Sequence, residues 1–150
     1  MRPAWVARYI GLHYVPGGSS FNGCDCQGLV ELAYRLERGV DGIFTPGPLW
    51  NPPTGEKTAL AAMAREIGQY ATAEMCRHCQ IFPGEEREWD VALLRVRGHP
   101  MHLGLILPDG EMLHIEEGAD SIIESYRGLR WGRKVVGFFR YGAEGGRDAG

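Results

Sequence analysis

The sequence lacks the features that define several other classes of protein. It has 4 cysteines in 150 residues, whereas a disulfide scaffold contains roughly 8–10% cysteine. No stretch approaches the roughly 20 apolar residues of a membrane span, and residues 1–15 hold no sustained apolar run of the kind found in a signal peptide. We therefore expect a chain that needs no disulfides, is made in the cytoplasm without an export signal of its own, and does not bind a membrane.

The charge balance is unfavourable for binding nucleic acid. The 16 Lys and Arg residues against 19 Asp and Glu residues give a net charge of −3, whereas a surface that follows phosphates needs a basic excess. Hydrophobic residues make up 44% of the chain, and its length is an ordinary size for one core. The expected organisation is one domain over residues 1–142, followed by a flexible tail over residues 143–150.

The spacing of apolar residues changes near the middle of the chain. The first half has helical spacing over residues 3–10, 26–38 and 58–76, with a proline-rich loop over 39–55. Asp25 is a natural N-cap for the second helix and Gly39 a natural end. The second half predicts strands over residues 91–96, 102–107, 111–115, 121–123 and 135–141. Helices followed by strands predict an α+β domain with an antiparallel sheet rather than a parallel βαβ arrangement.

Cys26 occupies a position that suits a nucleophile. It directly follows Asp25 at the start of a predicted helix, where unpaired backbone N–H groups and the positive end of the helix dipole both favour a thiolate. The alternative is that Cys26 is a small buried hydrophobe, as free cysteines usually are.

Two histidines interrupt apolar strands and could supply the base that a thiol needs. His102 opens the run His-Leu-Gly-Leu-Ile-Leu, and His114 lies twelve residues later in Met-Leu-His-Ile. Whether they face the same side depends on the turn between them, because side chains alternate along a strand.

The turn sequence Pro-Asp-Gly at residues 108–110 favours a shared face. A two-residue loop would put the two histidines on opposite faces. A three-residue loop, with a type I turn centred on Pro108 and Asp109 and a left-handed Gly110 in a bulge, pairs residue 107 with residue 111. Both histidines then lie on one face, and this is the turn that Pro and Gly at these positions prefer.

These residues lie in segments that resemble the NlpC/P60 family of cysteine peptidases. Residues 11–14 (Gly-Leu-His-Tyr) and 25–29 (Asp-Cys-Gln-Gly-Leu) resemble the family's Gly-x-x-Tyr and Asp-Cys-x-Gly-Leu segments. Residues 89–94 (Trp-Asp-Val-Ala-Leu-Leu) resemble its Gly-Asp-Leu-Val strand, with Trp89 in place of glycine. Residues 102–104 (His-Leu-Gly) resemble its His-Val-Gly strand, and residues 113–114 (Leu-His) resemble its final catalytic strand. The resemblance covers residues 3–141 and is nearest to short members known as cell-wall peptidases of tailed phages and gene transfer agents.

The resemblance implies a papain-like α+β fold, in which N-terminal helices pack on a C-terminal antiparallel sheet. It also implies an endopeptidase that cleaves peptidoglycan stem peptides, typically between D-γ-glutamyl and a diamino acid, with no cofactor. Cys26 would attack the carbonyl, His102 would take the thiol proton, and His114 would hold the His102 ring in the useful tautomer.

The resemblance also assigns residues to the oxyanion and substrate site. Tyr14 matches the family tyrosine near the oxyanion, and the backbone N–H of Cys26 would be the second donor. Asp25 and Gln27 flank the nucleophile, and Gln27 stands at a substrate-bordering position where many members carry serine.

Delivery to the wall needs a carrier, because a net charge of −3 gives no attraction to an anionic wall. A phage-like tail could hold the peptidase at the wall. The expected partners are therefore the peptidoglycan peptide and a tail-tip or hub protein, and the expected location is the tail of a phage-like particle.

Two other readings of the sequence compete with the peptidase. Cys76 and Cys79 form a C-x-x-C, which together with Cys24 and Cys26 could hold zinc or an iron–sulfur cluster. A smaller metal site could use Cys76 and Cys79 with His78. Recruiting Cys26 as a metal ligand would leave both strand histidines unexplained. The other reading is a tail component that keeps the fold without activity, which the complete Cys-His-His set disfavours.

Overall fold

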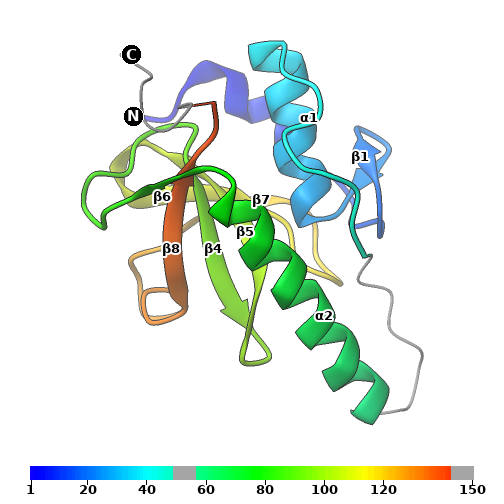
Figure 1. The fold of residues 1–150 in the computed structure, drawn as a ribbon. Helices are drawn as coiled ribbons and strands as arrows, with labels where there is room; N and C mark the ends of the chain where they lie inside the picture. The colour runs from blue at the N-terminus through cyan, green and yellow to red at the C-terminus, as the bar shows by residue number, and fades with distance from the viewer. Residues whose placement is uncertain (49–56, 143–150) are drawn as a thin grey trace.

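A six-stranded antiparallel sheet forms the centre of the fold (Figure 1), and a computed structural model describes residues 1–48 and 57–142 of the chain. The helices are η1 (Ala4–Tyr9, a 3-10 helix), α1 (Cys26–Arg38) and α2 (Lys57–Cys76). The strands are β1 (Ser19–Ser20), β2 (Gly23–Cys24), β3 (Cys79–Ile81), β4 (Val91–Val96), β5 (His99–Leu107), β6 (Glu111–His114), β7 (Ile122–Ser125) and β8 (Val135–Arg140). The large sheet has the order β3-β8-β4-β5-β6-β7, and β1 and β2 form a separate hairpin. This arrangement confirms the predicted α+β class.

Helix α1 begins and ends where the sequence predicts. The side chain of Asp25 accepts a hydrogen bond from the backbone N–H of Gly28, and Gly39 ends the helix in the left-handed conformation with φ of 66°. The buried face of α1 includes Leu29 and Ala33, both 0% exposed. Cys26 is therefore the first residue of a helix whose other turns are anchored in the core.

The sheet carries a hydrophobic core on each face, because side chains alternate between the two faces along β4 and β5. Leu93, Leu103 and Leu105 pack with η1, α1 and the end of α2. The even-numbered residues face the other way, where Leu94 and Ile106 pack with Trp131 and Tyr126 from the segment after β7. None of the described helices is both long and apolar enough to cross a membrane.

Helix α2 runs across the β5 side of the sheet, and its N-terminal end lies away from the sheet (Figure 1). Ala71 and Met75, near its C-terminal end, belong to the main core. Its middle part is covered by a small separate cluster in which Ala64 and Ile67 pack with Met101 of β5. The sequence predicted this helix with its start at residue 58.

Several elements differ from the prediction. The hairpin of β1 and β2 and the short strand β3 were not predicted, and β5 begins at residue 99 rather than 102. The first helix is a 3-10 helix, and the strand expected over 121–123 spans residues 122–125. The predicted tail over 143–150 and part of the predicted loop over 39–55 lie outside the described residues.

The turn between β5 and β6 confirms the predicted register but not the predicted turn type. Leu107 pairs with Glu111 and Gly110 is left-handed with φ of 75°. Asp109 is also left-handed, with φ of 67°, so the expected type I turn was wrong. Aspartate tolerates this conformation better than most residues, and here the N-terminal ammonium of Met1 binds its carboxylate.

Trp89, the residue that replaces a family glycine, has a φ of 80°. This region of φ favours glycine because a Cβ atom is crowded there. The indole is held by stacking on Trp5, with centroids 4.4 Å apart, and by an edge contact with Tyr34 at 5.1 Å. Ring packing on both sides therefore retains a backbone conformation that the side chain itself disfavours.

Candidate active site

Cys26 lies at the N-terminal end of α1, half-buried between the helix and the sheet. Backbone N–H groups of Leu103, Gln27 and Cys26 itself point at the sulfur and favour the thiolate. Burial and the neighbouring carboxylate of Asp25 act in the opposite direction and raise the pKa of the thiol to about 12. The backbone N–H groups therefore act in the predicted direction, but desolvation outweighs them.

The two strand histidines lie on one face of the sheet, as the turn predicted. Nε2 of His102 is 2.8 Å from Nδ1 of His114, and the two residues are 5% and 1% exposed. Trp131 covers both rings: it stacks on His102 with centroids 5.3 Å apart and meets His114 edge to face at 5.4 Å. The imidazoles are thus fixed and shielded from water.

Burial keeps both imidazoles neutral. The pKa of His102 falls to about 3, first because of burial and then because of His114 and Arg130. The pKa of His114 is also lowered by burial, although Glu124 and Glu116 raise it in part. Both the Cys26 thiol and the His102 imidazole are therefore neutral at rest.

Cys26 and His102 line the same cavity, which has a volume of about 170 Å³. Its walls come from the start of α1, the C-terminal half of α2, the first part of β5 and residues 115–117 after β6. Because Nε2 of His102 contacts His114, Nδ1 is the nitrogen that remains for the thiol. The fold thus brings a thiol and an imidazole from distant segments to one cavity.

Tyr14, which the resemblance assigns to the oxyanion site, also lines this cavity. Its backbone pairs with Cys24, two residues before the nucleophile. Burial is the main cause that raises the pKa of Tyr14, followed by the charges of Cys26 and Asp25. The phenol therefore keeps its proton and is available as a hydrogen-bond donor beside the sulfur.

Asp25 lines the cavity, but both of its carboxylate oxygens are already used by the backbone. One accepts from the N–H of Gly28 at 2.7 Å and the other from the N–H of Gly17 at 2.8 Å. Burial raises the pKa of Asp25, which these two bonds partly offset. Its observed contacts fix the loop before α1 and the start of the helix.

Gln27 forms part of the cavity wall and connects the two helices. Its side chain acts on two neighbours, since it lowers the pKa of Glu31, one turn later on α1, and of Tyr70 on α2, against the larger effect of burial, which raises both. The hydroxyl of Tyr70 in turn donates to the carbonyl of Thr45. Whether Gln27 contacts a substrate stays a prediction of the resemblance.

The thiols proposed as metal ligands do not lie close enough together to bind one metal ion. All four cysteines are free; Cys24 is buried, whereas Cys76 is exposed at the end of α2. Within residues 1–48 and 57–142, the one group of three potential ligands whose atoms lie within 4.8 Å of one another is His114, Glu116 and Glu124. The four thiols and His78 therefore make no preformed site in the described chain.

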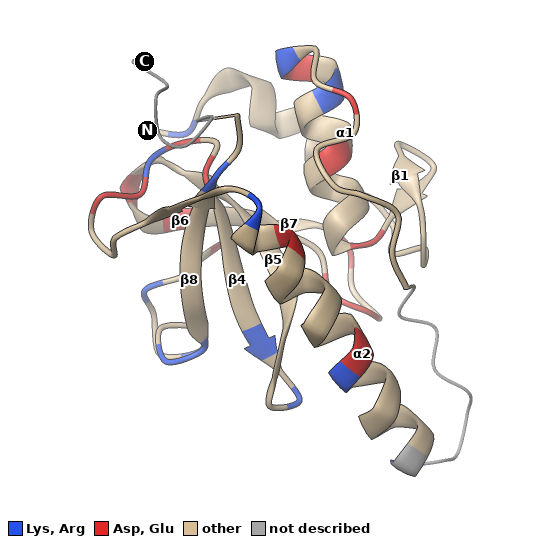
Figure 2. Cartoon of the chain, viewed as in Figure 1, with Lys and Arg blue, Asp and Glu red and all other residues tan. Residues whose placement is uncertain are grey.

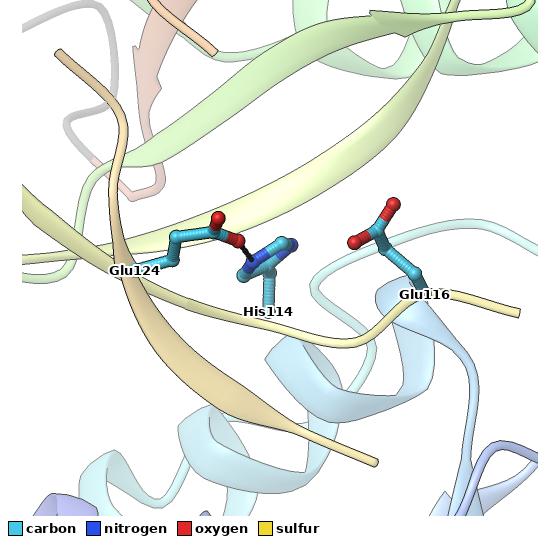
Figure 3. Close-up of side chains that lie close together, drawn as sticks. All are labelled: His114, Glu116 and Glu124. Atoms are coloured by element: carbon cyan, nitrogen blue, oxygen red, sulfur yellow. Dashed lines mark hydrogen bonds and ion pairs between the residues drawn. The ribbon is translucent and has the colours of Figure 1, made fainter. Parts of the chain in front are cut away.

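His114, Glu116 and Glu124 do lie close together (Figure 3), but their ligand atoms already bind other groups of the protein. Nε2 of His114 is 2.8 Å from Oε1 of Glu124. Arg130 binds both carboxylates, with contacts of 2.8 Å to Glu124 and 2.5 Å to Glu116. A guanidinium with two carboxylates suits an internal ion network better than a cation site.

Glu124, Arg130 and Trp131 are the residues that sequence reasoning missed. The sequence predicted a strand over 121–123, which ends just before Glu124, but gave no register between that strand and the histidines. The one available signal is a charged residue in the apolar strand segment Ile-Ile-Glu-Ser, which resembles any solvent-facing strand position.

A helix-borne thiol beside a histidine on an antiparallel sheet is the arrangement of a cysteine hydrolase. Residues 11–140 match the model of the NlpC/P60 family, and because this is most of the chain, the protein belongs to that family. Members of this family are cysteine peptidases or peptidoglycan hydrolases. No curated protein matches the chain.

Solved structures of NlpC/P60 proteins share the fold at low sequence identity. A family protein from Bacillus cereus is 16% identical with a TM-score of 0.61, and the match covers 94% of this chain and 41% of that one. The NlpC/P60 domain of the peptidoglycan hydrolase SagA is 19% identical with a TM-score of 0.58, covering 91% and 92%. NlpC1 from Trichomonas vaginalis is 19% identical with a TM-score of 0.60, covering 91% and 41%. The chain thus spans about two fifths of two of these proteins and nearly all of the third.

Proposed function

We propose that this chain is a cysteine endopeptidase that hydrolyses the stem peptides of peptidoglycan. The observation that carries the proposal is the cavity shared by the thiol of Cys26 and the imidazole of His102, with His114 against the far nitrogen of that imidazole. Family membership supports the reaction class, and the likeness to the SagA domain, named as part of a peptidoglycan hydrolase, supports the substrate.

The thiol proton moves as the sulfur attacks, because the resting thiol and imidazole are both neutral. Nδ1 of His102 accepts the proton from Cys26 while the sulfur adds to the peptide carbonyl carbon. The imidazolium then donates that proton to the leaving amine, the C–N bond breaks and a thioester remains. Water, deprotonated by His102, hydrolyses the thioester and restores the thiol.

The negative oxygen of the tetrahedral intermediate needs donors near the sulfur. The backbone N–H of Cys26 and the hydroxyl of Tyr14 are the proposed donors, and both residues line the cavity. In other acyl-transfer enzymes one such donor is worth about 2.7–4 kcal/mol of transition-state stabilisation.

The proposed bond joins D-γ-glutamate to a diamino acid. The resemblance to the NlpC/P60 segments supports this choice of bond. The glutamates that line the cavity are paired within the protein, since Glu74 binds Arg77, Glu116 binds Arg130 and Glu117 binds Arg97. Charges of both signs are interspersed over the rest of the described chain (Figure 2).

Mass spectrometry of purified muropeptides tests the proposal. The reduced, metal-free protein is incubated with disaccharide-linked and free stem peptides, beside Cys26→Ala as the matched control. The expected product pair ends in D-γ-glutamate and begins with the diamino acid, and Cys26→Ala forms neither. Intact muropeptides with the wild-type protein would contradict the proposal, and cleavage at another peptide bond would reject the bond while keeping the reaction class.

The proposed setting is the tail of a phage-like particle, where the peptidase acts at the wall of a target cell. The resemblance to short tail-borne members and the net charge of −3 support this setting. A tail-tip or hub protein would supply the local concentration that the chain's own charge does not. Pulldowns with tail-tip proteins and sedimentation with sacculi test it: a tail partner and weak wall binding are expected, whereas tight wall binding without a partner contradicts it.

A further inference from the structure

A third side chain continues the line of contacts that starts at His102. Glu124 lies on β7 opposite Met112, the residue two positions before His114 on β6. A diagonal neighbour across two antiparallel strands is within reach of a long side chain, and Oε1 of Glu124 is 2.8 Å from Nε2 of His114 (Figure 3). The unbroken order is therefore His102, His114, Glu124.

This order permits one assignment of the ring protons. A carboxylate only accepts hydrogen bonds, so Nε2 of His114 carries the hydrogen that Glu124 binds. Nδ1 of a neutral His114 is then an acceptor, and Nε2 of His102 must donate to it across 2.8 Å. A neutral His102 is left with its lone pair on Nδ1, the nitrogen available to the Cys26 thiol.

We propose that Glu124 is a positioning residue that fixes the tautomers of both histidines and supplies the negative charge that balances the imidazolium of His102 during the reaction. This inference rests on the proposed role of Cys26 and His102. With the opposite tautomers, Nδ1 of His102 would carry a hydrogen and could not accept the thiol proton.

Glu124 is itself held in place by two further groups. Nη1 of Arg130 binds both of its oxygens at 2.8 and 3.0 Å, and the indole N–H of Trp131 donates to Oε1 at 3.1 Å. Burial raises the pKa of Glu124, but these contacts and His114 together outweigh it, so the pKa is lowered and the carboxylate stays ionised. Trp131 also stacks on His102, so one residue orients both ends of the series.

Glu124 does not line the substrate cavity, and its side chain is 25% exposed. Its effect therefore belongs to the chemical step and not to substrate binding. Loss of its charge should lower kcat with little change in KM, whereas a general loosening of the cleft would change both.

Three variants separate the charge of Glu124 from its acceptor function. Glu124→Gln keeps an oxygen for the His114 N–H but loses the charge, and Glu124→Met keeps the length but loses both. Glu111→Gln is the matched control, since Glu111 is a carboxylate on neighbouring β6 that binds Arg2 at the surface, away from the cavity. Circular dichroism verifies that each variant is folded.

Two measurements need no substrate. Imidazole nitrogen chemical shifts in isotope-labelled protein report the tautomers, and the rate of Cys26 alkylation by iodoacetamide at neutral pH reports the thiol–imidazole pair. We expect Glu124→Gln to keep the His114 tautomer and to alkylate about tenfold more slowly. Glu124→Met should shift His114 to the Nδ1–H tautomer and alkylate about a hundredfold more slowly, and Glu111→Gln should match the wild type.

The same variants are then assayed on a stem peptide, where kcat should fall in the same order with KM unchanged. An Nδ1–H tautomer of His114 in the wild type would overturn the inference, as would Glu124→Met with wild-type tautomers and alkylation rate. Tautomers and alkylation rates that follow the expectation, without cleavage of any stem peptide, would support the role of Glu124 and reject the proposed function alone.

Discussion

Asp25 caps helix α1 at Gly28, with its Oδ1 2.7 Å from the Gly28 nitrogen. The same carboxylate binds the N–H of Gly17 and raises the pKa of the adjacent Cys26 thiol. One side chain thus stabilises the helix that carries the nucleophile and disfavours the ionised form of that nucleophile.

Asp25→Asn should separate these two effects. The asparagine oxygen can replace one of the two backbone contacts, so the free energy of unfolding should fall by about 1–2 kcal/mol. Removal of the negative charge should lower the pKa of Cys26, and the midpoint of its alkylation against pH should move to lower pH. Urea unfolding tests the change in stability, and Cys26 alkylation rates measured over a range of pH test the change in pKa. A midpoint that stays in place or rises, in protein shown to be folded, would contradict the electrostatic part.

Stability should depend on pH through His102. Its pKa is 6.5 when unperturbed and about 3 in the folded chain, so the unfolded state binds a proton first as the pH falls. The stabilisation is complete above about pH 6.5 and is lost progressively towards pH 3, by at most about 1.4 kcal/mol per pH unit for one proton. The lowered pKa of His114 acts in the same direction.

Urea unfolding between pH 7 and pH 4 checks this expectation, with His102→Gln as the control. The variant should lose stability less steeply over this range because one of the two buried imidazoles is gone. Equal slopes for the two proteins would mean that the folded state protonates His102 as readily as the unfolded chain.

Trp89 offers a test of strain against packing. Its φ of 80° costs a non-glycine residue about 1–2 kcal/mol, whereas loss of a packed Trp side chain, here stacked on Trp5, costs about 3–5 kcal/mol. Both Trp89→Ala and Trp89→Gly should therefore destabilise the fold. Glycine should be the better replacement by about 1 kcal/mol, although alanine is normally favoured over glycine. Thermal and urea unfolding of the two variants decide it; a more stable alanine variant would show that the backbone relaxes.

The parts of the fold that local sequence encodes were predictable. The bounds of α1 follow from the Asp25 cap and the Gly39 end, and the shared face of the histidines follows from the turn at 108–110. Strand β3 was missed because its three residues become a strand only by pairing with β8, as in Cys79 with Arg140. Such a pairing joins segments about 60 residues apart, and no local pattern specifies it.

In the site, too, local sequence predicts some residues, whereas others depend on contacts between distant segments. Cys26, His102 and His114 stand out as residue types in unusual positions, so the sequence identifies them. Glu124 does not, because its contact depends on the register between β6 and β7 across the irregular segment 115–121. The high pKa of the Cys26 thiol was also hidden, since burial by the sheet and not the helix start determines it.

Substitutions at the proposed nucleophile and base should give the largest losses of activity. Cys26→Ala and His102→Ala should each abolish hydrolysis of a stem peptide, because loss of either member of such a pair costs several orders of magnitude in comparable enzymes. His114→Ala should leave more activity, since His114 orients the base without taking part in bond making. Cys24→Ala should keep wild-type kcat and lose about 1 kcal/mol of stability, because Cys24 is 0% exposed in the core.

Hydrolysis rates, measured together with circular dichroism and metal analysis, distinguish the peptidase from a metal-binding protein and from an inactive component. The folded state should survive in all four variants, and none should release metal, because the thiols are not gathered in the described chain. Full activity in Cys26→Ala would exclude the thiol as nucleophile. Loss of both bound metal and folding in that variant would instead identify Cys26 as a structural ligand, because removing one thiolate from a structural metal site removes the folding free energy that the metal supplies.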